Sequence, residues 1–510
     1  MNQDATKWRE RTDSQANKSR LRIVHIRIYR NADAWTGPLI LLVLTVSPWL
    51  FGTTQPATIL AMNIAGYVLG GLLACKWIIR RFYGFEPARW NTNIPQWLTL
   101  LLGFLTAILL SYCLVSALNA RSIWMQSTGT FQYFHYLAWL PHSYDEAGTW
   151  RAFRNYSALA CLFWAIHDWL MGLTPTEEQM RRSAKSHRTE GGQPTFFFPA
   201  RLRLLLWVLS INGGLLAAEG IVQRLTTNKL LWLVVPTVHK EAATQFGPYA
   251  YRSNAAQYFN LLWPVTLGFW WTLHRGGGFK RWRHHWLLAC GILMAACPII
   301  STTRGGALVA GGMLICAAVF FLLSPLILRS QPRFTPRATT LTIIALGIFF
   351  LGASWLGIHF GWAALAPRMA EIEQGYTNRE QTYETARQLA KDYPIFGTGP
   401  GTFTAVFKFY RSAADEFWPV QLHNDWLETR ITFGALGSLF IGLALMVVLA
   451  RWFTPGGIHG GRRFVVLTWI AITGCLIHAL FDFPFQIYSI LMLFLTICAM
   501  LSTLSRRVTK

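Results

Sequence analysis

The most restrictive feature of this sequence is a succession of apolar runs separated by short polar or basic segments. Each run has about 20 residues, the length at which a helix crosses the hydrocarbon core of a bilayer. Lipid offers the backbone no hydrogen-bond partner, and the runs lack the alternation of polar and apolar residues that marks a barrel strand. The sequence therefore predicts an all-α polytopic membrane bundle and excludes a soluble fold.

Twelve runs are long enough to be predicted as transmembrane helices. An even number of such helices places both chain termini on the same side of the membrane. The predicted helices lie near residues 36–52, 57–78, 96–117, 152–172, 203–222, 255–273, 285–301, 306–328, 339–358, 432–450, 464–481 and 486–504.

The formal net charge of +23 follows the same topology. About two thirds of the 46 Lys and Arg residues lie in the two tails and in every second loop, where the positive-inside rule places them in the cytoplasm. These loops are short and lack the interleaved aromatic residues of a nucleic-acid groove. The basic excess therefore indicates orientation in the membrane, and we expect no nucleic-acid partner.

The chain is expected to have five parts. A basic cytoplasmic tail (1–35) precedes nine transmembrane helices (36–358), and a large outward-facing loop (359–431) follows them. The last three helices (432–504) lead to a short cytoplasmic tail (505–510). Because the large loop is the longest hydrophilic stretch, the chemistry is expected there.

Ligand spacing in the sequence does not predict a metal site. All eight cysteines lie inside apolar runs or at their ends, so we expect no disulfide and no zinc. His423 and Asp425 form a His-x-Asp pair, and Glu371 and Glu373 form an acidic pair, but neither pair completes the ligand set of a metal ion. We therefore expect no metal and no other cofactor, and a bound cation is the alternative.

His423 is the best catalytic candidate in the chain. It lies where the large loop enters the next helix, with Asn424, Asp425 and Glu428 beside it as supporting residues. A neutral imidazole in that position can accept a proton from a hydroxyl near neutral pH. The alternative is a hydrogen-bonded histidine at the membrane interface that has no chemical role.

Arg304 lies between two apolar runs with almost no loop around it. An ionised side chain at that depth costs about 3 kcal/mol unless it snorkels to the interface or finds an anionic partner. The glycines that follow it open a helix whose N-terminus adds positive potential, so the segment is suited to a diphosphate. Arg252, just before the sixth predicted helix, has the same character with weaker support.

The large loop supplies two more arginines. A capping-box pattern at residues 377–380 predicts a helix that ends before Pro394. Along that helix Arg379, Tyr383 and Arg387 would share one face, because they are spaced by four residues. That face either holds a polyanionic ligand or belongs to an ordinary solvated helix.

Two further segments are expected on the same side of the membrane. The glycine-rich segment from Pro394 to Phe403 predicts an irregular loop whose amides either cradle a phosphate or merely reverse the chain. Asp482 lies in the short turn between the last two helices, at the depth expected for His423. It either orients the histidine or a sugar hydroxyl, or it caps the final helix.

The order and spacing of these pieces resemble the O-antigen ligase and polymerase superfamily, over about residues 210–490. The resemblance rests on Arg252-Ser253-Asn254 before a span, Thr303-Arg304-Gly305 at a tight turn, the segment from Pro394 to Phe403, and the segment from His423 to Glu428.

The resemblance implies a bundle of the C-type membrane glycosyltransferase kind in the cytoplasmic (inner) membrane, which works on the periplasmic side without metal. Its donor would be a polyprenyl-diphosphate-linked glycan. Arginines of that family hold the diphosphate, which matches Arg304 and Arg252, and a histidine of the large loop is its proposed base, which matches His423.

The sequence therefore predicts a ligase-like glycosyltransferase that moves the glycan, with inversion, to a hydroxyl of a lipid, protein or glycan acceptor. Arg304 with Arg379 or Arg387 would stabilise the leaving diphosphate, and His423 would deprotonate the acceptor. A polymerase of the same superfamily, an anion transporter and a structural component of the envelope are the alternatives. A transporter is disfavoured because no internal repeat relates the two halves.

Overall fold

A computed structural model of the chain is mostly helical. The one sheet among the residues that the structure describes is a hairpin in which β1 (Ser122–Met125) pairs antiparallel with β2 (Thr130–Tyr133). This confirms the predicted helical class and adds the hairpin to it. The structure describes residues 23–89, 96–186, 198–226, 230–236, 245–275, 282–327, 336–410, 420–450 and 461–504.

Each of the twelve segments predicted as a transmembrane helix is helical in the structure. These helices are α2 (Ile23–Trp49), α3 (Pro56–Tyr83), α4 (Gln96–Leu118), α5 (Glu146–Met171), α7 (Ala200–Leu225), α8 (Arg252–Arg275), α9 (Trp286–Ile300), α10 (Arg304–Ile327), α11 (Pro336–Gly357), α15 (Asp425–Ala450), α16 (Arg462–His478) and α17 (Tyr488–Thr503).

Seven stretches within the described residues are long and apolar enough to cross a membrane. They comprise α3, α4, α7, α10 and α15, together with Arg283–Ile300 and Thr339–Ala370. The remaining predicted spans are also helices, but they are either too short or too polar to meet that standard. The chain is therefore a multi-helix membrane protein, and a count of twelve crossings stays a prediction.

Several element boundaries differ from those predicted. The segment taken as the start of the large loop is still helical, because α11 continues through a π-helical turn (η5, Ile358–Trp362) into α12 (Ala363–Ala370). α13 (Ile372–Asp392) begins before the capping-box pattern and ends where Pro394 predicted. α2 begins inside the predicted N-terminal tail, while residues 1–22 and 505–510 of the tails lie outside the described residues.

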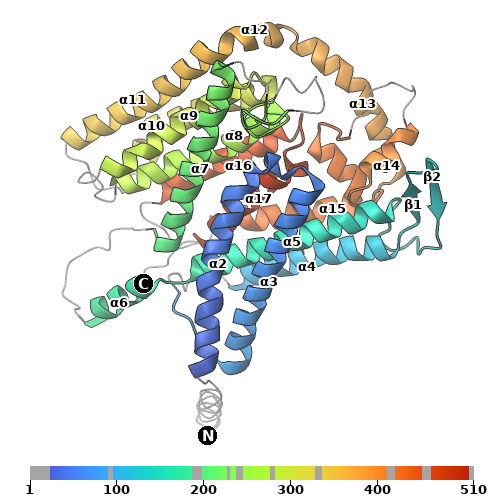
Figure 1. Cartoon of the computed structure of the whole chain (residues 1–510), viewed down its shortest axis with the longest axis horizontal. Coiled ribbons are helices and arrows are strands. Elements are labelled where there is room, and N and C mark those ends of the chain that lie inside the picture. The colour runs from blue at the N-terminus through green and yellow to red at the C-terminus, as the bar shows by residue number, and fades with distance from the viewer. Residues whose placement is uncertain are drawn as a thin grey trace.

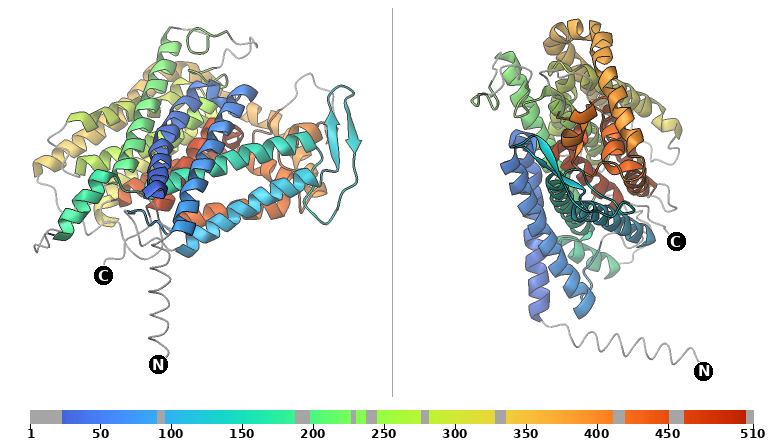
Figure 2. Two further views of the ribbon diagram at one scale, coloured as in Figure 1. Left: turned by 60° about the horizontal axis from the view of Figure 1, so that its bottom comes forward. Right: turned by 90° about the vertical axis from the view of Figure 1, so that its right-hand side faces the viewer.

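α8 lies at the centre of the bundle and packs against α7, α9, α10, α16 and α17. Its large side chains are almost completely buried, among them Trp263 and Trp270. α11, α12 and α13 form an arc across the top of the molecule in Figure 1, and α13 descends to pack on α15. The β1–β2 hairpin projects beyond the ends of α4 and α5 (Figure 2).

This arrangement brings four chain segments together at one end of the bundle, which we call the site end. α8, α10 and α15 begin there, and α16 ends there, followed by the turn that carries Asp482. Short helical elements in the connections complete the described fold. They include α6 (Pro175–Ser186), η4 (Trp282–His285), α14 (Phe403–Phe407), η6 (Lys408–Tyr410) and η8 (Pro484–Gln486).

Candidate functional site

The backbone of His423 has a left-handed conformation, with φ of 58°. A non-glycine residue adopts this conformation at a cost, and it persists only where the surroundings enforce it. The hydroxyl of Tyr383 on α13 donates a hydrogen bond to the His423 carbonyl at 2.8 Å. On the other side Leu422 is buried in the cluster that packs α13 against α14. The fold therefore holds this residue in one strained position.

The three residues predicted to support His423 organise the start of α15. Asn424 caps the helix, since its Oδ1 accepts a hydrogen bond from the Leu427 amide at 3.0 Å. Glu428 accepts the amide of Leu422 at 2.9 Å. Asp425 accepts the amide of Phe485 at 2.7 Å, which ties α15 to the segment after Asp482. All three side chains therefore hold backbone groups that position His423.

Asp482 lies directly against the histidine. Its Oδ1 is 3.2 Å from His423 Nδ1, and its Oδ2 accepts a hydrogen bond from the Ser253 hydroxyl and lies 3.7 Å from His478 Nε2. Burial acts to raise the pKa of Asp482, but the hydrogen bonds and charges of these three neighbours outweigh it and hold that pKa below its usual value. An ionised carboxylate beside Nδ1 favours the tautomer with hydrogen on Nδ1, which leaves Nε2 as the proton acceptor.

Aromatic rings form the wall on which His423 rests. Phe483 meets the imidazole edge to face at a centroid distance of 4.7 Å, and Tyr251 does so at 6.1 Å. The two aromatic rings stack on each other at 5.6 Å. Burial and the charge of Asp482 raise the pKa of the Tyr251 hydroxyl, which therefore stays neutral. The histidine side chain keeps 27% of its surface exposed, against 6% for Asp482, so a substrate can reach it.

A cluster of arginines surrounds the turn before α10. Arg252 donates to the hydroxyl of Thr302 at 2.9 Å, and Arg368 of α12 donates to the Thr302 carbonyl at 3.1 Å. Arg224 of α7 donates to the Ser301 carbonyl at 3.3 Å. Thr302 has a left-handed φ of 59°, so this turn is also strained. Two of these arginines were not predicted from the sequence, Arg224 and Arg368.

Arg304 and Arg379 extend the cluster toward His423. Arg304 opens α10 and pairs with the exposed Glu371 at 3.4 Å. Arg379 donates to the Phe481 carbonyl at 2.8 Å. A Cβ on Gly305 would overlap the ring of Phe481, so the start of α10 packs directly on the turn that carries Asp482. The predicted base and the predicted anion ligands therefore lie on two sides of one turn.

Two helix N-termini add to the positive potential of this cluster. α8 begins at Arg252 and α10 begins at Arg304. Each helix has more than 20 residues, and the start of such a helix carries about half a positive charge. Among the described residues, no hydrogen-bond acceptor reaches the buried Nε of Arg224 or of Arg304. The cluster therefore has unused capacity for an anionic ligand.

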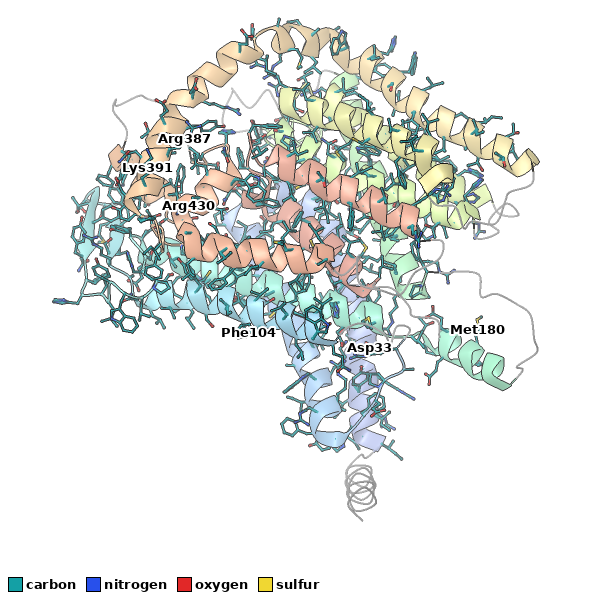
Figure 3. The ribbon with its side chains drawn as sticks, turned by 180° about the vertical axis from the view of Figure 1, so that it is seen from behind. Asp33, Phe104, Met180, Arg387, Lys391 and Arg430 are labelled. Atoms are coloured by element: carbon teal, nitrogen blue, oxygen red, sulfur yellow. The ribbon has the colours of Figure 1, made fainter. Side chains whose placement is uncertain are left out.

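Arg387 does not join this cluster. It lies eight residues beyond Arg379 on α13, a rise of about 12 Å, and its side chain is exposed. Figure 3 shows it in the same part of the molecule as Lys391 and Arg430. Of the three residues predicted to share one face of this helix, Arg379 and Tyr383 therefore contact the site, whereas Arg387 does not.

The glycine-rich segment binds the backbone of α15 where that helix is broken, and we call this contact the glycine clamp. Gly434 breaks that helix with φ of 62° and ψ of −168°, which frees the carbonyls of Ile431 and Thr432. The amides of Thr398 and Gly399 take up these carbonyls at 2.8 and 3.0 Å. Because these two amides are engaged, the structure favours the chain-reversal interpretation over the phosphate cradle.

Sequence reasoning missed Arg224, Arg368, Ser253 and His478 as neighbours of the site. Arg224 and Arg368 lie near the ends of helices, where a basic side chain is usually explained by snorkelling to the membrane interface and so does not indicate a binding site. Their predicted side of the membrane could have indicated a role, because it is the same as that of Arg304. Ser253 was visible only as part of the Arg252-Ser253-Asn254 pattern.

Residues 289–442 of the chain match the O-antigen ligase family. The matched region runs from α9 into α15 and includes Arg304, Arg368, Arg379 and His423, while Arg252 and Asp482 lie outside it. No curated protein matches the chain. The match supports the O-antigen ligase superfamily, whose members are membrane enzymes of the glycosyltransferase and ligase type.

Proposed function

We propose that this chain, which carries an O-antigen ligase domain, transfers a glycan from a polyprenyl diphosphate to an acceptor hydroxyl. The observation that carries the proposal is the meeting of a carboxylate-oriented histidine and an arginine cluster at the turn of residues 481–483. Glycosyl transfer from a diphosphate needs both features. A base must take the acceptor proton, and cations must stabilise the departing diphosphate.

In this mechanism Nε2 of His423 accepts the proton of the acceptor hydroxyl while that oxygen attacks the anomeric carbon. The bond between the anomeric carbon and the diphosphate oxygen breaks, and polyprenyl diphosphate leaves with one additional negative charge. Attack opposite the leaving group inverts the anomeric centre. Asp482 stabilises the imidazolium through Nδ1, and the imidazolium then returns its proton to solvent or product.

The arginine cluster would hold the diphosphate. The proposal keeps Arg304, Arg252 and Arg379 and adds Arg368 and Arg224 because they contact the same turn. Arg304 is the member best placed to change partner, since its ion pair is with Glu371, whose side chain is 64% exposed. An exposed ion pair is worth little, so a diphosphate can displace it. The polyprenyl chain would lie in the surrounding membrane lipid, and the site would face the periplasm.

The test uses purified chain, a polyprenyl-diphosphate oligosaccharide and a set of lipid, protein and glycan acceptors, with products read by mass. We expect His423→Ala to lower transfer by about 10²- to 10⁴-fold while it still binds the donor, because general-base catalysis contributes that much. The matched control is His135→Ala, an exposed histidine after the β1–β2 hairpin. Unchanged transfer by His423→Ala would overturn the proposal.

The same assay separates a ligase from a polymerase. A ligase joins the glycan to a lipid or protein acceptor, whereas a polymerase lengthens a second lipid-linked glycan. The anomeric configuration of the product, read by nuclear magnetic resonance, reports whether the transfer inverts the sugar. Retention of configuration would exclude the single in-line displacement described above.

A further inference from the structure

A second group of chemistry-bearing residues lies at the other end of α8. His274 is in the last turn of that helix, and His284 and His285 are in η4, just before α9. One ring nitrogen from each of the three histidines lies within 4.8 Å of the other two. Within the part of the chain that the structure describes, no other three His, Cys, Asp or Glu residues converge in this way.

We propose that His274, His284 and His285 form a binding site for one divalent transition-metal ion of the zinc class, with water in the fourth position. Neutral imidazole is a preferred ligand of such ions, and three histidines plus water make a known tetrahedral set. At metal-to-nitrogen distances of about 2.0–2.1 Å, tetrahedral geometry separates two ligand nitrogens by about 3.4 Å. His274 Nδ1 and His284 Nε2 are already 3.1 Å apart.

His285 is the ligand that has room to complete the set. Its side chain is half-buried, whereas His274 and His284 are 2% and 4% exposed. Its ring packs on that of His284 at a centroid distance of 4.1 Å. In the proposed site this one side chain rotates so that its nitrogen moves from within 4.8 Å of the other two to ligand separation.

The surroundings of His274 have the features of an outer ligand shell. Its Nε2 lies 3.0 Å from the hydroxyl of Thr342 on α11. When Nε2 donates its hydrogen to that hydroxyl, the lone pair is on Nδ1, which faces His284. This is how outer partners fix the tautomer of metal-binding histidines. Trp270 stacks on the imidazole at 4.9 Å and 19°, which fixes the ring plane.

The proposed ion would join three helices at the end of the bundle opposite His423. It would bridge the end of α8 to the start of α9, and through Thr342 it would be anchored to α11. His274 lies 22 residues along α8 from Arg252, a rise of about 33 Å. The ion therefore has a stabilising role that is independent of glycan transfer, and its test does not depend on that activity.

The experiment uses the full chain, purified without a polyhistidine tag, stripped with a chelator and dialysed against Zn²⁺. We expect one bound Zn²⁺ per chain and, with Co²⁺ in its place, the visible absorption of tetrahedral cobalt. Thermal unfolding should shift to higher temperature in Zn²⁺, because the ion binds the folded state.

Three variants make the result decisive. His285→Gln removes the half-buried ligand and should abolish the bound Zn²⁺, while Thr342→Val should weaken binding by about 10- to 100-fold. His135→Ala is the matched control and should bind as the parent does. The proposal is overturned if the parent chain binds no Zn²⁺, or if His285→Gln and the control bind equally. Comparable unfolding temperatures without metal show that each variant is folded.

Discussion

Replacing Asp482 by Asn tests the proposed base most sharply, because it changes one charge and almost no volume. The side chain of Asp482 is 6% exposed and lies 3.2 Å from His423 Nδ1, so solvent screens the pair very little. A hydrogen bond to a charged group contributes about 1.5–3 kcal/mol. Each 1.36 kcal/mol corresponds to a factor of ten in rate, so kcat should fall by about 10- to 150-fold.

The assay is single-turnover glycan transfer with saturating donor, together with a separate measurement of donor binding. Donor affinity should stay within about twofold, since the arginines that hold the diphosphate are untouched. Asp392→Asn is the control, because that carboxylate is exposed on α13 and bonded to the Tyr410 hydroxyl at 2.8 Å. If Asp482→Asn retains full kcat in a folded protein, the orienting role assigned to Asp482 is wrong.

The pH dependence of this variant provides a second readout. The pKa of Asp482 is held below its usual 3.8, so the carboxylate is ionised at neutral and mildly acid pH. Its contribution to stability is present above that usual value and is lost only as pH falls through the lowered one. Asp482→Asn lacks this carboxylate, so the loss of stability that the parent shows as pH falls through the lowered pKa should be smaller in the variant, and thermal unfolding across the acid range measures the difference.

Two further predictions concern the anion cluster and the glycine clamp. Arg368→Gln should raise KM for the donor by about tenfold or more with a smaller effect on kcat, because a charge-assisted contact is lost. Lys391→Gln, which changes an exposed lysine near the end of α13, should leave KM unchanged in the same assay. Gly397→Ala should lower the unfolding temperature more than Gly129→Ala. Both glycines have positive φ, but only the Cβ at Gly397 would collide with the Ile431 carbonyl, and the opposite order would refute the clamp.

Most of the helices follow from the sequence because lipid leaves the backbone no alternative to internal hydrogen bonds. The sequence also predicts that His423 and Asp482 lie on the same side of the membrane, since adjacent spans alternate direction. The contact between their side chains did not follow. It depends on the left-handed backbone of His423, which is held by a hydrogen bond from the distant Tyr383 and by the burial of the neighbouring Leu422.

Other features depended on tertiary contacts that no local pattern encodes. The sequence of the glycine-rich segment is equally consistent with a phosphate-binding loop and with a chain reversal. The two are distinguished by the break in α15 at Gly434, which leaves two carbonyls for the segment to bind. Arg387 continues the four-residue spacing of Arg379 and Tyr383, yet α13 carries it away from the cluster because the site meets only one turn of that helix. His274 lies ten residues before the adjacent pair His284 and His285, a spacing that matches no common metal-ligand motif, so the sequence did not reveal the cluster.

The kind of partner each cation has distinguishes the two ends of the bundle. Away from the site, Lys76 lies 3.2 Å from Asp33 and 2.8 Å from Asp168, and Arg80 and Arg201 pair with the same two carboxylates. Those charges are largely neutralised, as a structural network requires.

At the site end the arginines bind mainly neutral oxygens. Arg368 and Arg379 donate to backbone carbonyls, and Arg252 donates to a threonine hydroxyl. A carbonyl fixes the position of a guanidinium but leaves its charge uncompensated, and several such charges near two helix N-termini repel one another until an anion binds. The cluster is therefore more stable with a polyanion than without one, which is the property that a diphosphate-binding site must have and that a purely structural network lacks.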